Sequence, residues 1–317
     1  MPSPQRILLV KTSSLGDVIH NLPVASDLAA RFSGIEIDWA IEEGFAEIPR
    51  LHPAVRRVFP VAVRRWRGAP FSRRTWREIA SFRQQLAAET YDAVLDTQGL
   101  LKSALIARQA RGAHWGYDAG SAREPLAARF YDAVFPVPKT LHAVERNRRL
   151  AAAAFGYAPP DLDYGVADTR GADARGVSVI LLTASSREDK LWPDEHWVAL
   201  GGALSRRGLT PLLPGGSSLE RRRARDLAAR IPGAQAIPPM TLTALASLFR
   251  HARLAVGVDT GLTHLAAAMR TPTLALYTAT DPGLTGVLGT DWHRNLGGRG
   301  IVPPVDAVLA ELQDVLA

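Results

Sequence analysis

Residues 253–269 read R-L-A-V-G-V-D-T-G-L-T-H-L-A-A-A-M, and this stretch decides the fold. The apolar run Leu254–Val258 predicts a buried strand, Asp259–Gly261 a tight turn, and the alanine-rich residues from Leu262 a helix. A strand that turns straight into a helix brings free backbone N–H groups and the positive end of the helix dipole to one point. The stretch therefore predicts a site for an anion such as a phosphate.

The residues of this turn suit different parts of such a site. Thr260 offers a hydroxyl, and Gly261 lets a phosphate approach the backbone closely because it has no side chain. Asp259 would repel a phosphate, so we expect its carboxylate to cap the helix or to accept hydrogen bonds from sugar hydroxyls. His264 follows one helical turn later. A purely structural turn, with an aspartate cap and a core-facing histidine, explains the stretch about equally well.

Length and composition indicate a soluble globular protein of about two domains. Of the 317 residues, 47% are hydrophobic and 22% charged, and no apolar run reaches the ~18 residues that a membrane span requires. The segment after Met1 lacks the charged-then-apolar layout of a signal peptide. The absence of cysteine excludes disulfides and thiolate metal sites, and it fits a cytoplasmic location.

The excess positive charge lies entirely in the first half of the chain. Residues 1–157 carry 22 Lys and Arg against 15 Asp and Glu, whereas residues 158–317 carry 16 of each, which accounts for the net charge of +7. Residues 50–83 alone hold ten arginines, one acid (Glu78) and five large aromatic residues, Phe59, Trp66, Phe71, Trp76 and Phe82. This composition predicts a surface that faces phosphates or an anionic bilayer. A nucleic-acid surface or a solvated basic face would have the same composition.

A second strand–loop–helix pattern opens the chain. Arg6–Val10 is expected to be a strand, Lys11–Asp17 a loop and Val18–Phe32 a helix. Neither G-x-G-x-x-G nor G-x-x-x-x-G-K-[ST] occurs, so neither a dinucleotide-dependent hydride enzyme nor a P-loop NTPase is indicated. Asp17 stands after the first strand, where open α/β sheets present their reactive groups. Its alternative role is that of an ordinary N-cap for the following helix.

Strand and helix patterns alternate along the rest of the chain, which predicts an α/β fold. The polar residues 158–176, rich in Pro and Gly, are expected to link two Rossmann-like domains of parallel sheet, residues 1–157 and 177–317, that face each other across a cleft. Further expected strands are Ile35–Ile41, Tyr91–Asp96, Val177–Leu182, Thr210–Pro214 and, as the last, Leu274–Tyr277. Further expected helices are Leu100–Arg111, His142–Ala154, Pro193–Arg206, Leu242–His251 and Val305–Leu316.

Six motifs resemble glycosyltransferase family 9, the lipopolysaccharide heptosyltransferases, and within it the heptosyltransferase I group. They are K-T-S-S-L-G-D-V (Lys11–Val18), R-R-W-R (Arg64–Arg67), A-R-E-P-L-A (Ala122–Ala127), H-A-V-E-R (His142–Arg146), D-K-L-W-P-D-E-H-W (Asp189–Trp197) and D-T-G-L-T-H-L (Asp259–Leu265). Their order and spacing extend from about Arg6 to the C-terminus. The last motif suits the whole family, whereas the first three favour heptosyltransferase I over a heptosyltransferase II-like enzyme with a different acceptor.

The resemblance implies an inverting glycosyltransferase with the GT-B fold. It would move L-glycero-D-manno-heptose from ADP-heptose to the Kdo sugar of Kdo2-lipid A, as a peripheral enzyme on the cytoplasmic face of the inner membrane. The motif match makes Asp17 the general base. It assigns to the donor site Ser185, Ser186, Lys190, Glu220, Met240, Asp259, Thr260, Gly261 and His264, and to the acceptor Lys11, Arg64, Arg67, Lys102 and Arg123. Within the donor site, Lys190, Thr260 and Gly261 match diphosphate contacts, and Glu220 and Met240 match adenosine contacts.

The chemistry of an inverting displacement agrees with this assignment. It requires a base beside the acceptor hydroxyl and a positive charge for the leaving ADP. Asp17 and Lys190 supply them, so neither a metal nor another cofactor is expected. A nucleic-acid-binding protein would leave both residues without a purpose, and the closer alternative is a GT-B transferase with another nucleotide sugar.

Two positions depart from the family pattern. The family has a Thr pair where this chain has Ser185-Ser186, and Gly-Pro where it has Thr278-Ala279. The first change keeps the hydroxyls. The second removes a special backbone geometry, which bears on the loop after Tyr277.

Overall fold

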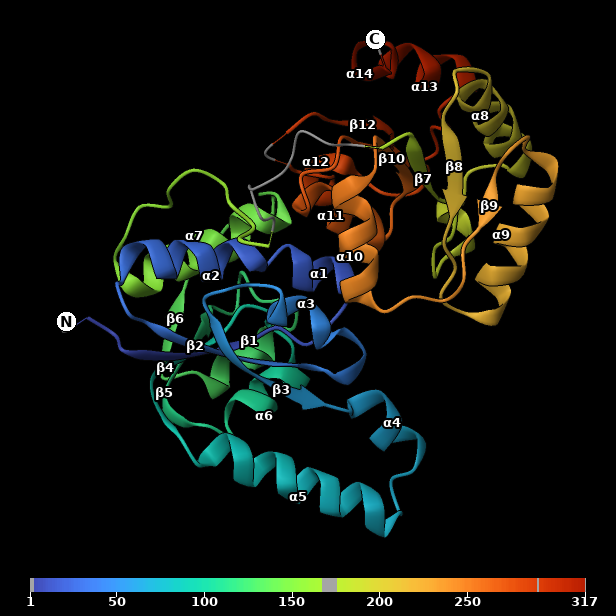
Figure 1. Ribbon diagram of the computed structural model, residues 1–317. Coiled ribbons are helices and arrows are strands. Elements are labelled where there is room, and N and C mark those ends of the chain that lie inside the picture. Colours follow the sequence, from blue (N-terminus) through green and yellow to red (C-terminus); the bar gives the residue numbers. More distant parts are fainter. Residues whose placement is uncertain (1–2, 167–175, 290, 317) are drawn as a thin grey trace. The chain divides into compact units, whose positions relative to one another are not determined.

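The chain forms two compact units, Met1–Gly165 and Val166–Ala317 (Figure 1). The computed structural model describes residues 3–166, 176–289 and 291–316. In the described part of each unit, six strands form one parallel sheet. The expected α/β class with two parallel-sheet units is therefore confirmed. The division falls inside the expected linker 158–176, of which residues 167–175 lie outside the described residues.

The sheet of the first unit has the strand order β3-β2-β1-β4-β5-β6. Its strands are β1 (Arg6–Val10), β2 (Glu36–Glu42), β3 (Val55–Val61), β4 (Thr90–Asp96), β5 (Arg111–Tyr117) and β6 (Ala133–Phe135). The helices are α1 (Leu15–Ile19), α2 (Leu22–Arg31), α3 (Glu47–Arg50), α4 (Val63–Gly68), α5 (Arg73–Ala87), α6 (Leu101–Ala107) and α7 (Ala143–Phe155), with 3-10 turns η1 (Glu43–Phe45) and η2 (Pro125–Phe130). Figure 1 shows α2 and α7 on one face of the sheet and α5 and α6 on the other.

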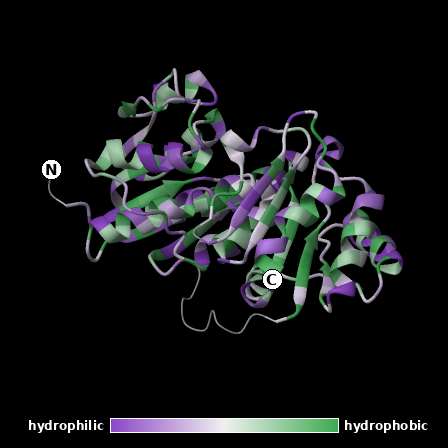
Figure 2. Ribbon diagram, turned by 90° about the horizontal axis from the view of Figure 1, so that it is seen from above, coloured by the Kyte–Doolittle hydropathy of each residue, from purple (hydrophilic) through white to green (hydrophobic). Residues whose placement is uncertain are grey.

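The sheet of the second unit has the order β12-β11-β10-β7-β8-β9. Its strands are β7 (Ser178–Leu182), β8 (Thr210–Leu213), β9 (Gln235–Ala236), β10 (Leu254–Val258), β11 (Thr273–Tyr277) and β12 (His293–Gly297). The helices are α8 (Asp194–Arg206), α9 (Ser218–Arg230), α10 (Leu242–His251), α11 (Gly261–Ala268), α12 (Pro282–Thr285), α13 (Val305–Glu311) and α14 (Gln313–Leu316), with the 3-10 turn η3 (Glu188–Lys190). Hydrophobic residues concentrate in the strands of both units, whereas the helices carry hydrophobic and hydrophilic residues in alternation (Figure 2). Both sheets are therefore buried by helices on their two faces.

Local chemistry explains several helix ends. His142 Nδ1 accepts a hydrogen bond from Val144 N at 3.2 Å at the start of α7, and Gly156 ends that helix with a φ of 68°. Ser217 and Glu220 form a reciprocal capping box at the start of α9. These signals are local in sequence, which is why the predicted ends of α7 agree with the structure to within one residue.

Three expected helices were wrong in extent. The segment Val18–Phe32 belongs to two helices, because α2 starts anew with Pro23 in its first turn and proline cannot continue a preceding helix. The helix expected over Leu100–Arg111 ends at Ala107, and Arg111 already begins β5. The helix expected over Val305–Leu316 divides into α13 and α14.

The expectation that Leu274–Tyr277 is the last strand was also wrong, because β12 follows it and pairs with β11 in parallel. The sequence of β12, H-R-N-L-G, is polar, as suits an edge strand that is half-exposed. Strands β3, β5, β6 and β9 were likewise not predicted. Such short or polar strands lack the continuous apolar run that marks a central strand.

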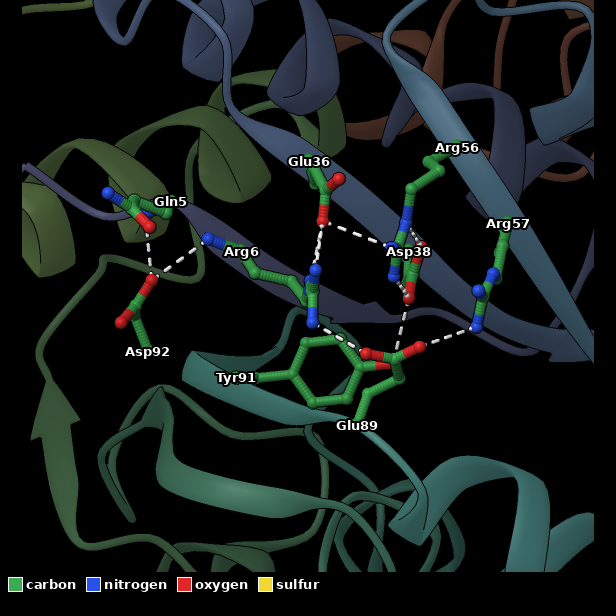
Figure 3. Close-up of polar contacts among 9 residues, drawn as sticks. All are labelled: Gln5, Arg6, Glu36, Asp38, Arg56, Arg57, Glu89, Tyr91 and Asp92. Atoms are coloured by element: carbon green, nitrogen blue, oxygen red, sulfur yellow. Dashed lines mark hydrogen bonds and ion pairs between the residues drawn. The ribbon is translucent and has the colours of Figure 1, made fainter.

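Ion pairs at the amino-terminal end of the first sheet neutralise two arginines of the basic segment 50–83 (Figure 3). Arg56 Nη2 lies 2.6 Å from Oδ2 of the fully buried Asp38, and Tyr91 donates to the same oxygen at 2.9 Å. Arg57 pairs with Glu89 at 2.7 Å. These arginines stabilise the sheet and are not available to an anionic partner.

Three of the five aromatic residues in the same segment belong to the core, which corrects the expectation of an aromatic surface. Phe59 is 6% and Phe82 8% exposed, and Trp66 packs against the same cluster. Only Phe71 and Trp76 are well exposed, at 97% and 62%. The segment therefore contributes to the core through β3 and α5 as well as to the surface.

A buried ion pair between α2 and α7 offers a test of this packing. Arg148 donates to both carboxylate oxygens of Asp27, at 2.8 and 2.9 Å, and to Pro160 O. Asp27 is fully buried. Arg148→Met should therefore lower the unfolding free energy of the first unit by about 3–5 kcal/mol, because it leaves an unpaired buried carboxylate.

The double variant Asp27→Leu/Arg148→Met removes both charges and should recover most of that loss. Urea unfolding of the wild type and the two variants measures the difference. If the double variant is as unstable as Arg148→Met alone, the contact with Pro160, and not the orphaned charge, accounts for the effect.

Candidate active site

The two sheets share one strand order, which fixes where a ligand site can form. The second unit, read as β9-β8-β7-β10-β11-β12, repeats the β3-β2-β1-β4-β5-β6 order of the first. In such a doubly wound sheet the strand order reverses between β1 and β4, and between β7 and β10, and ligands bind where the loops diverge at the carboxyl ends of these strands. Several residues singled out from the sequence follow these strands: Asp17 follows β1, Lys102 follows β4, Lys190 follows β7 and Asp259 follows β10.

A glutamine holds the loop that follows β1. Gln98 Oε1 accepts hydrogen bonds from Thr12 N at 2.6 Å and from the Thr12 hydroxyl at 2.8 Å, and Gln98 Nε2 donates to Ser13 O at 2.7 Å. Gln98 itself follows β4, where its backbone N donates to Asp96 Oδ1 at 2.8 Å. Sequence reasoning missed Gln98, because it lies 86 residues from Thr12 and no local pattern marks it.

Asp17 is the third residue of α1, whose N-cap is Ser14. Asp17 Oδ2 accepts hydrogen bonds from Ser14 N at 2.9 Å and from the Ser14 hydroxyl at 3.1 Å, and Arg123 Nη1 lies 3.5 Å away. No described residue donates a hydrogen bond to Oδ1. Burial opposes the charge of this carboxyl, but Lys11, Arg123 and Ser14 together hold the pKa of Asp17 below its usual range. The carboxylate is thus ionised at neutral pH and has one oxygen available for a proton.

Lys11, which the resemblance assigns to the acceptor, is buried in the first unit. Its side chain is 6% exposed, and Nζ donates to Thr97 O at 2.8 Å and to Asn147 Oδ1 at 3.2 Å. Burial lowers its pKa to about 8, against the opposing effect of Asp17. Lys11 therefore acts on Asp17 through its charge.

The other four predicted acceptor cations are more accessible. Arg64 and Arg67 lie exposed on α4, and Arg123 is exposed beside Asp17. Lys102, on α6, donates to Ser13 Oγ at 2.9 Å, and burial together with the positive charges of Arg64 and Arg67 lowers its pKa. The structure thus gathers these cations around the loops after β1 and β4.

Arg146 is a further cation of this cluster that was quoted in a motif but not assigned. It lies on α7, with its guanidinium carbon 5.0 Å from the centre of the Tyr117 ring, and it donates to Ser121 O at 2.7 Å. Its charge helps to lower the pKa of Lys11.

In the second unit, Asp259 follows β10 and is the centre of a polar cluster. Lys190 Nζ donates to Asp259 Oδ2 at 2.7 Å, and Thr280 Oγ1 donates to the same oxygen at 2.6 Å. His264 Nε2 lies 3.8 Å from Oδ1. Burial opposes the charge, but His264, Lys190 and Thr280 hold the pKa of Asp259 far below its usual range. Thr280 was not predicted, because its only mark is its position in the loop after β11.

The expectation that Asp259 caps the following helix was wrong. The N-cap of α11 is Thr260, and its hydroxyl makes no capping hydrogen bond. The first turn of α11 therefore presents the Gly261 backbone and the Thr260 hydroxyl without an acidic cap. A Cβ on Gly257 would lie 2.2 Å from Thr263 Oγ1, so glycine there permits α11 to pack closely on β10.

The remaining donor candidates lie in the segments that follow β7, β8 and β9. Ser185 Oγ donates weakly to Asp259 O at 3.4 Å, and Ser186 is exposed. Glu220 Oε2 accepts from the backbone N of Ser217 at 2.8 Å, so its carboxylate is engaged in the cap of α9. Met240 is 38% exposed. The structure brings Ser185, Lys190 and the Asp259 turn together, while Glu220 lies in the first turn of α9 and Met240 on the loop after β9.

The departure from the family pattern after Tyr277 does not strain the loop. Neither Thr278 nor Ala279 has a positive φ, so no glycine is required there. Thr278 Oγ1 donates to Asp189 O at 2.6 Å. The loop is therefore attached to the segment that carries Lys190.

The family model described as glycosyltransferase family 9 (heptosyltransferase) matches residues 79–300. "Lipopolysaccharide heptosyltransferase 1" of Escherichia coli (strain K12) is 46% identical over 290 residues, which cover 90% of this chain and 91% of that protein. This chain belongs to glycosyltransferase family 9. Like its relatives, it is a glycosyltransferase of the heptosyltransferase family.

Two solved structures are similar over nearly the whole length of this family member. The E. coli heptosyltransferase WaaC with ADP has a TM-score of 0.90 at 41% identity, with 98% of this chain and 100% of that chain covered. The same enzyme with ADP-2-deoxy-2-fluoro heptose has a TM-score of 0.88 at 40% identity, with 98% and 99% covered. The fold expected from the resemblance, GT-B with two Rossmann-like units, is confirmed.

Two further observations concern the described residues of this glycosyltransferase. No three His, Asp or Glu side chains gather there in a way that could hold a metal ion. None of the helices in the described ranges is both long and apolar enough to cross a bilayer.

The buried position of Lys11 leads to a pH-dependent prediction. Folding lowers the pKa of Lys11 from 10.5 to about 8, so the unfolded chain binds the ammonium proton more tightly than the folded chain does. The free energy of unfolding should therefore rise as the pH rises from about 8 to 10.5, by about 3 kcal/mol in total. The chain has four lysines, Lys11, Lys102, Lys139 and Lys190. In NMR spectra of protein labelled at the lysine ε-carbon, the Lys11 resonance, assigned from a Lys11→Arg variant, should titrate near pH 8.

The resonance of Lys139, an exposed lysine of the same unit, is the reference within the same sample. If the Lys11 resonance titrates at the same pH as that of Lys139, the buried position of Lys11 and its electrostatic role would be contradicted.

Proposed function

We propose that this glycosyltransferase transfers L-glycero-D-manno-heptose from ADP-heptose to the Kdo sugar of Kdo2-lipid A, with inversion at the anomeric carbon. The observation that carries the proposal is that each unit has an ionised carboxylate among cations at the switch point of its sheet, Asp17 in one and Asp259 in the other. The similarity to a lipopolysaccharide heptosyltransferase 1, and to structures with ADP and an ADP-heptose analogue, supports the choice of substrates.

The second unit holds the donor in this proposal. The ammonium of Lys190 and the amino-terminal turn of α11, at Thr260 and Gly261, neutralise the diphosphate. Ser185 and Ser186 add hydroxyl donors, and Glu220 and Met240 contact the adenosine. Asp259 and His264 bind the heptose. Lys190 exchanges part of its contact with Asp259 for the diphosphate, so neither anion is left without a positive neighbour.

The first unit holds the acceptor. Kdo carboxylates and lipid A phosphates are anions, and Arg64, Arg67, Lys102 and Arg123 offer the cations to bind them. The guanidinium groups of the three arginines can each bind a carboxylate or a phosphate in a bidentate manner. Arg123 is 51% exposed at its side chain, so it is accessible to such an anion while it still lies near Asp17.

Asp17 acts as the base. As the acceptor oxygen forms its bond to the anomeric carbon, the hydroxyl proton passes to Asp17 Oδ1, and the bond from that carbon to the ADP oxygen breaks with its electron pair leaving on ADP. An acceptor anion on Arg123 weakens the attraction of that arginine for Asp17, which raises the pKa of the carboxylate at the moment when it must take the proton. Lys11 remains in place and keeps the free carboxylate ionised.

The location of the enzyme follows from its acceptor in this proposal. Lipid A is anchored in the inner membrane and ADP-heptose is dissolved in the cytoplasm, so the enzyme works as a peripheral protein at the cytoplasmic face.

An assay of ADP release tests the function. Purified protein with ADP-heptose and Kdo2-lipid A should release ADP and yield one heptosylated product, with no loss of rate in excess EDTA, because Lys190 and α11 supply the charge for the diphosphate. Kdo2-lipid A that already carries this heptose should not serve as acceptor. Release of ADP only with the pre-heptosylated acceptor would assign a heptosyltransferase II-like function instead.

A matched control separates the specific role of Lys190 from the effect of removing any positive charge from its loop. Lys190→Ala should lower kcat by on the order of 10² or more and weaken ADP binding, because the charge on the leaving diphosphate grows in the transition state. Arg187→Ala is the matched control, since Arg187 lies in the same loop but pairs with Asp189. Calorimetric ADP binding and initial rates measure both variants. Equal effects of the two substitutions would contradict a specific role for Lys190.

A further inference from the structure

The outer surface of α5 carries a second group of basic and aromatic residues, distinct from the cations near Asp17. We name the set Phe71, Arg73, Trp76, Arg77 and Arg83 the α5 outer surface. Trp76 and Arg77 follow Arg73 at the three- and four-residue spacing that places side chains on one face of a helix, and Arg83 follows Trp76 after seven residues, which is two helical turns. All four are exposed. The opposite face of α5 contributes Thr75, Phe82 and Leu86 to the interior. Figure 1 shows α5 along the outside of the first unit, with α4 next to its amino-terminal end.

The arginines of this surface differ from their neighbours in the segment 50–83 because no acid neutralises them. Arg56 and Arg57 pair with Asp38 and Glu89 (Figure 3). In the described part of the chain, Arg73, Arg77 and Arg83 make no ion pair or side-chain hydrogen bond. Their positive charge is therefore unopposed at the surface.

Glu78, the single acid of the segment, is already occupied. It accepts hydrogen bonds from Arg65 at 2.7 Å, Arg74 at 2.8 Å and Trp66 Nε1 at 2.9 Å. The Glu78 carboxylate is therefore already paired, on the side of α5 that faces α4. The α5 outer surface itself contains no acidic residue.

Both aromatic side chains of this surface are exposed, and a hydrogen bond holds the ring of Trp76 in place. Trp76 Nε1 donates to Pro70 O at 3.0 Å, which satisfies its only donor and fixes the indole against the loop that carries Phe71. Phe71 is 97% and Trp76 62% exposed. An exposed aromatic pair next to three unpaired arginines is typical of a helix that lies in the interface of a bilayer, with rings at the headgroup level and cations on lipid phosphates.

We propose that the α5 outer surface binds an anionic phospholipid bilayer, with α5 in the plane of the membrane. The rings of Phe71 and Trp76 enter the boundary between headgroups and acyl chains, and Arg73, Arg77 and Arg83 contact lipid phosphates. Charge complementarity selects an anionic bilayer as the partner. The inference deepens the proposed function, because an acceptor anchored in lipid would lie in the same bilayer, but binding of lipid requires neither donor nor acceptor.

Sedimentation with vesicles tests the charges of this surface. Without any substrate, the protein should bind vesicles of phosphatidylcholine and phosphatidylglycerol and should bind pure phosphatidylcholine much less, with binding weakened by salt. Arg73→Gln/Arg77→Gln/Arg83→Gln should lower the partition coefficient roughly 100-fold, at about fivefold for each arginine. Arg206→Gln/Arg207→Gln/Arg225→Gln removes the same charge from exposed positions of the second unit and should have little effect.

Because the chain has no cysteine, one labelled position reports directly on insertion of the rings. Phe71→Cys with an environment-sensitive fluorophore should show a blue shift on anionic vesicles and quenching by brominated acyl chains. The same label at Ala229→Cys, an exposed position on α9, should show neither.

The outcomes separate this inference from the proposed function. The triple variant of the α5 outer surface should keep wild-type turnover with a detergent-dispersed acceptor and lose turnover only on vesicles. Equal vesicle binding by the two triple variants, or no quenching at Phe71→Cys, would overturn the inference while leaving the ADP-release assay unaffected. Loss of duplex DNA binding in the first triple variant without loss of vesicle binding would overturn it in favour of a nucleic-acid surface.

Discussion

A carboxylate that is largely shielded from water and keeps its negative charge is the feature on which the candidate site of each unit depends. Removing a carboxylate from water is costly unless cations and hydrogen-bond donors surround it. Lys11 and Arg123 meet this need for Asp17, and Lys190 does so for Asp259. In the first unit Lys11 and Asp17 follow β1 and Arg123 follows β5, and in the second unit Lys190 follows β7 and Asp259 follows β10. The fold thus supplies the carboxylate and its cations from separate segments.

Because the charges come from separate loops, hydrogen bonds must hold these loops in fixed positions within each unit. Gln98 ties the loop after β4 to the loop that leads from β1 to Asp17, and Thr278 ties the loop after β11 to the segment of Lys190. Arg123 and Lys190, two of the cations that stabilise these carboxylates, are also ones that the proposed substrates would engage. Binding then exchanges one anionic partner for another, and no buried charge is left alone at any stage.

The sequence predicts those parts of the site that are encoded locally. The turn after β10 and the start of α11 follow from the apolar run Leu254–Val258 and from Gly261 after it. Contacts between distant residues could not be predicted, as the hydrogen bonds from Thr12 to Gln98 and from Thr280 to Asp259 illustrate. Composition alone was misleading for the basic segment, because Phe59 is buried in the core and the side chain of Arg56 pairs with Asp38.

The general-base role of Asp17 is the central claim, and chemical rescue tests it most directly. Asp17→Ala should lower kcat by roughly 10² to 10⁴ while ADP affinity stays near wild type. Formate is a small carboxylate that fits the space left by the side chain. Added formate should raise the kcat of this variant at least about tenfold, whereas chloride at equal ionic strength should not. A variant that binds ADP normally but gains nothing from formate would contradict the account and leave Asp17 a structural residue of α1.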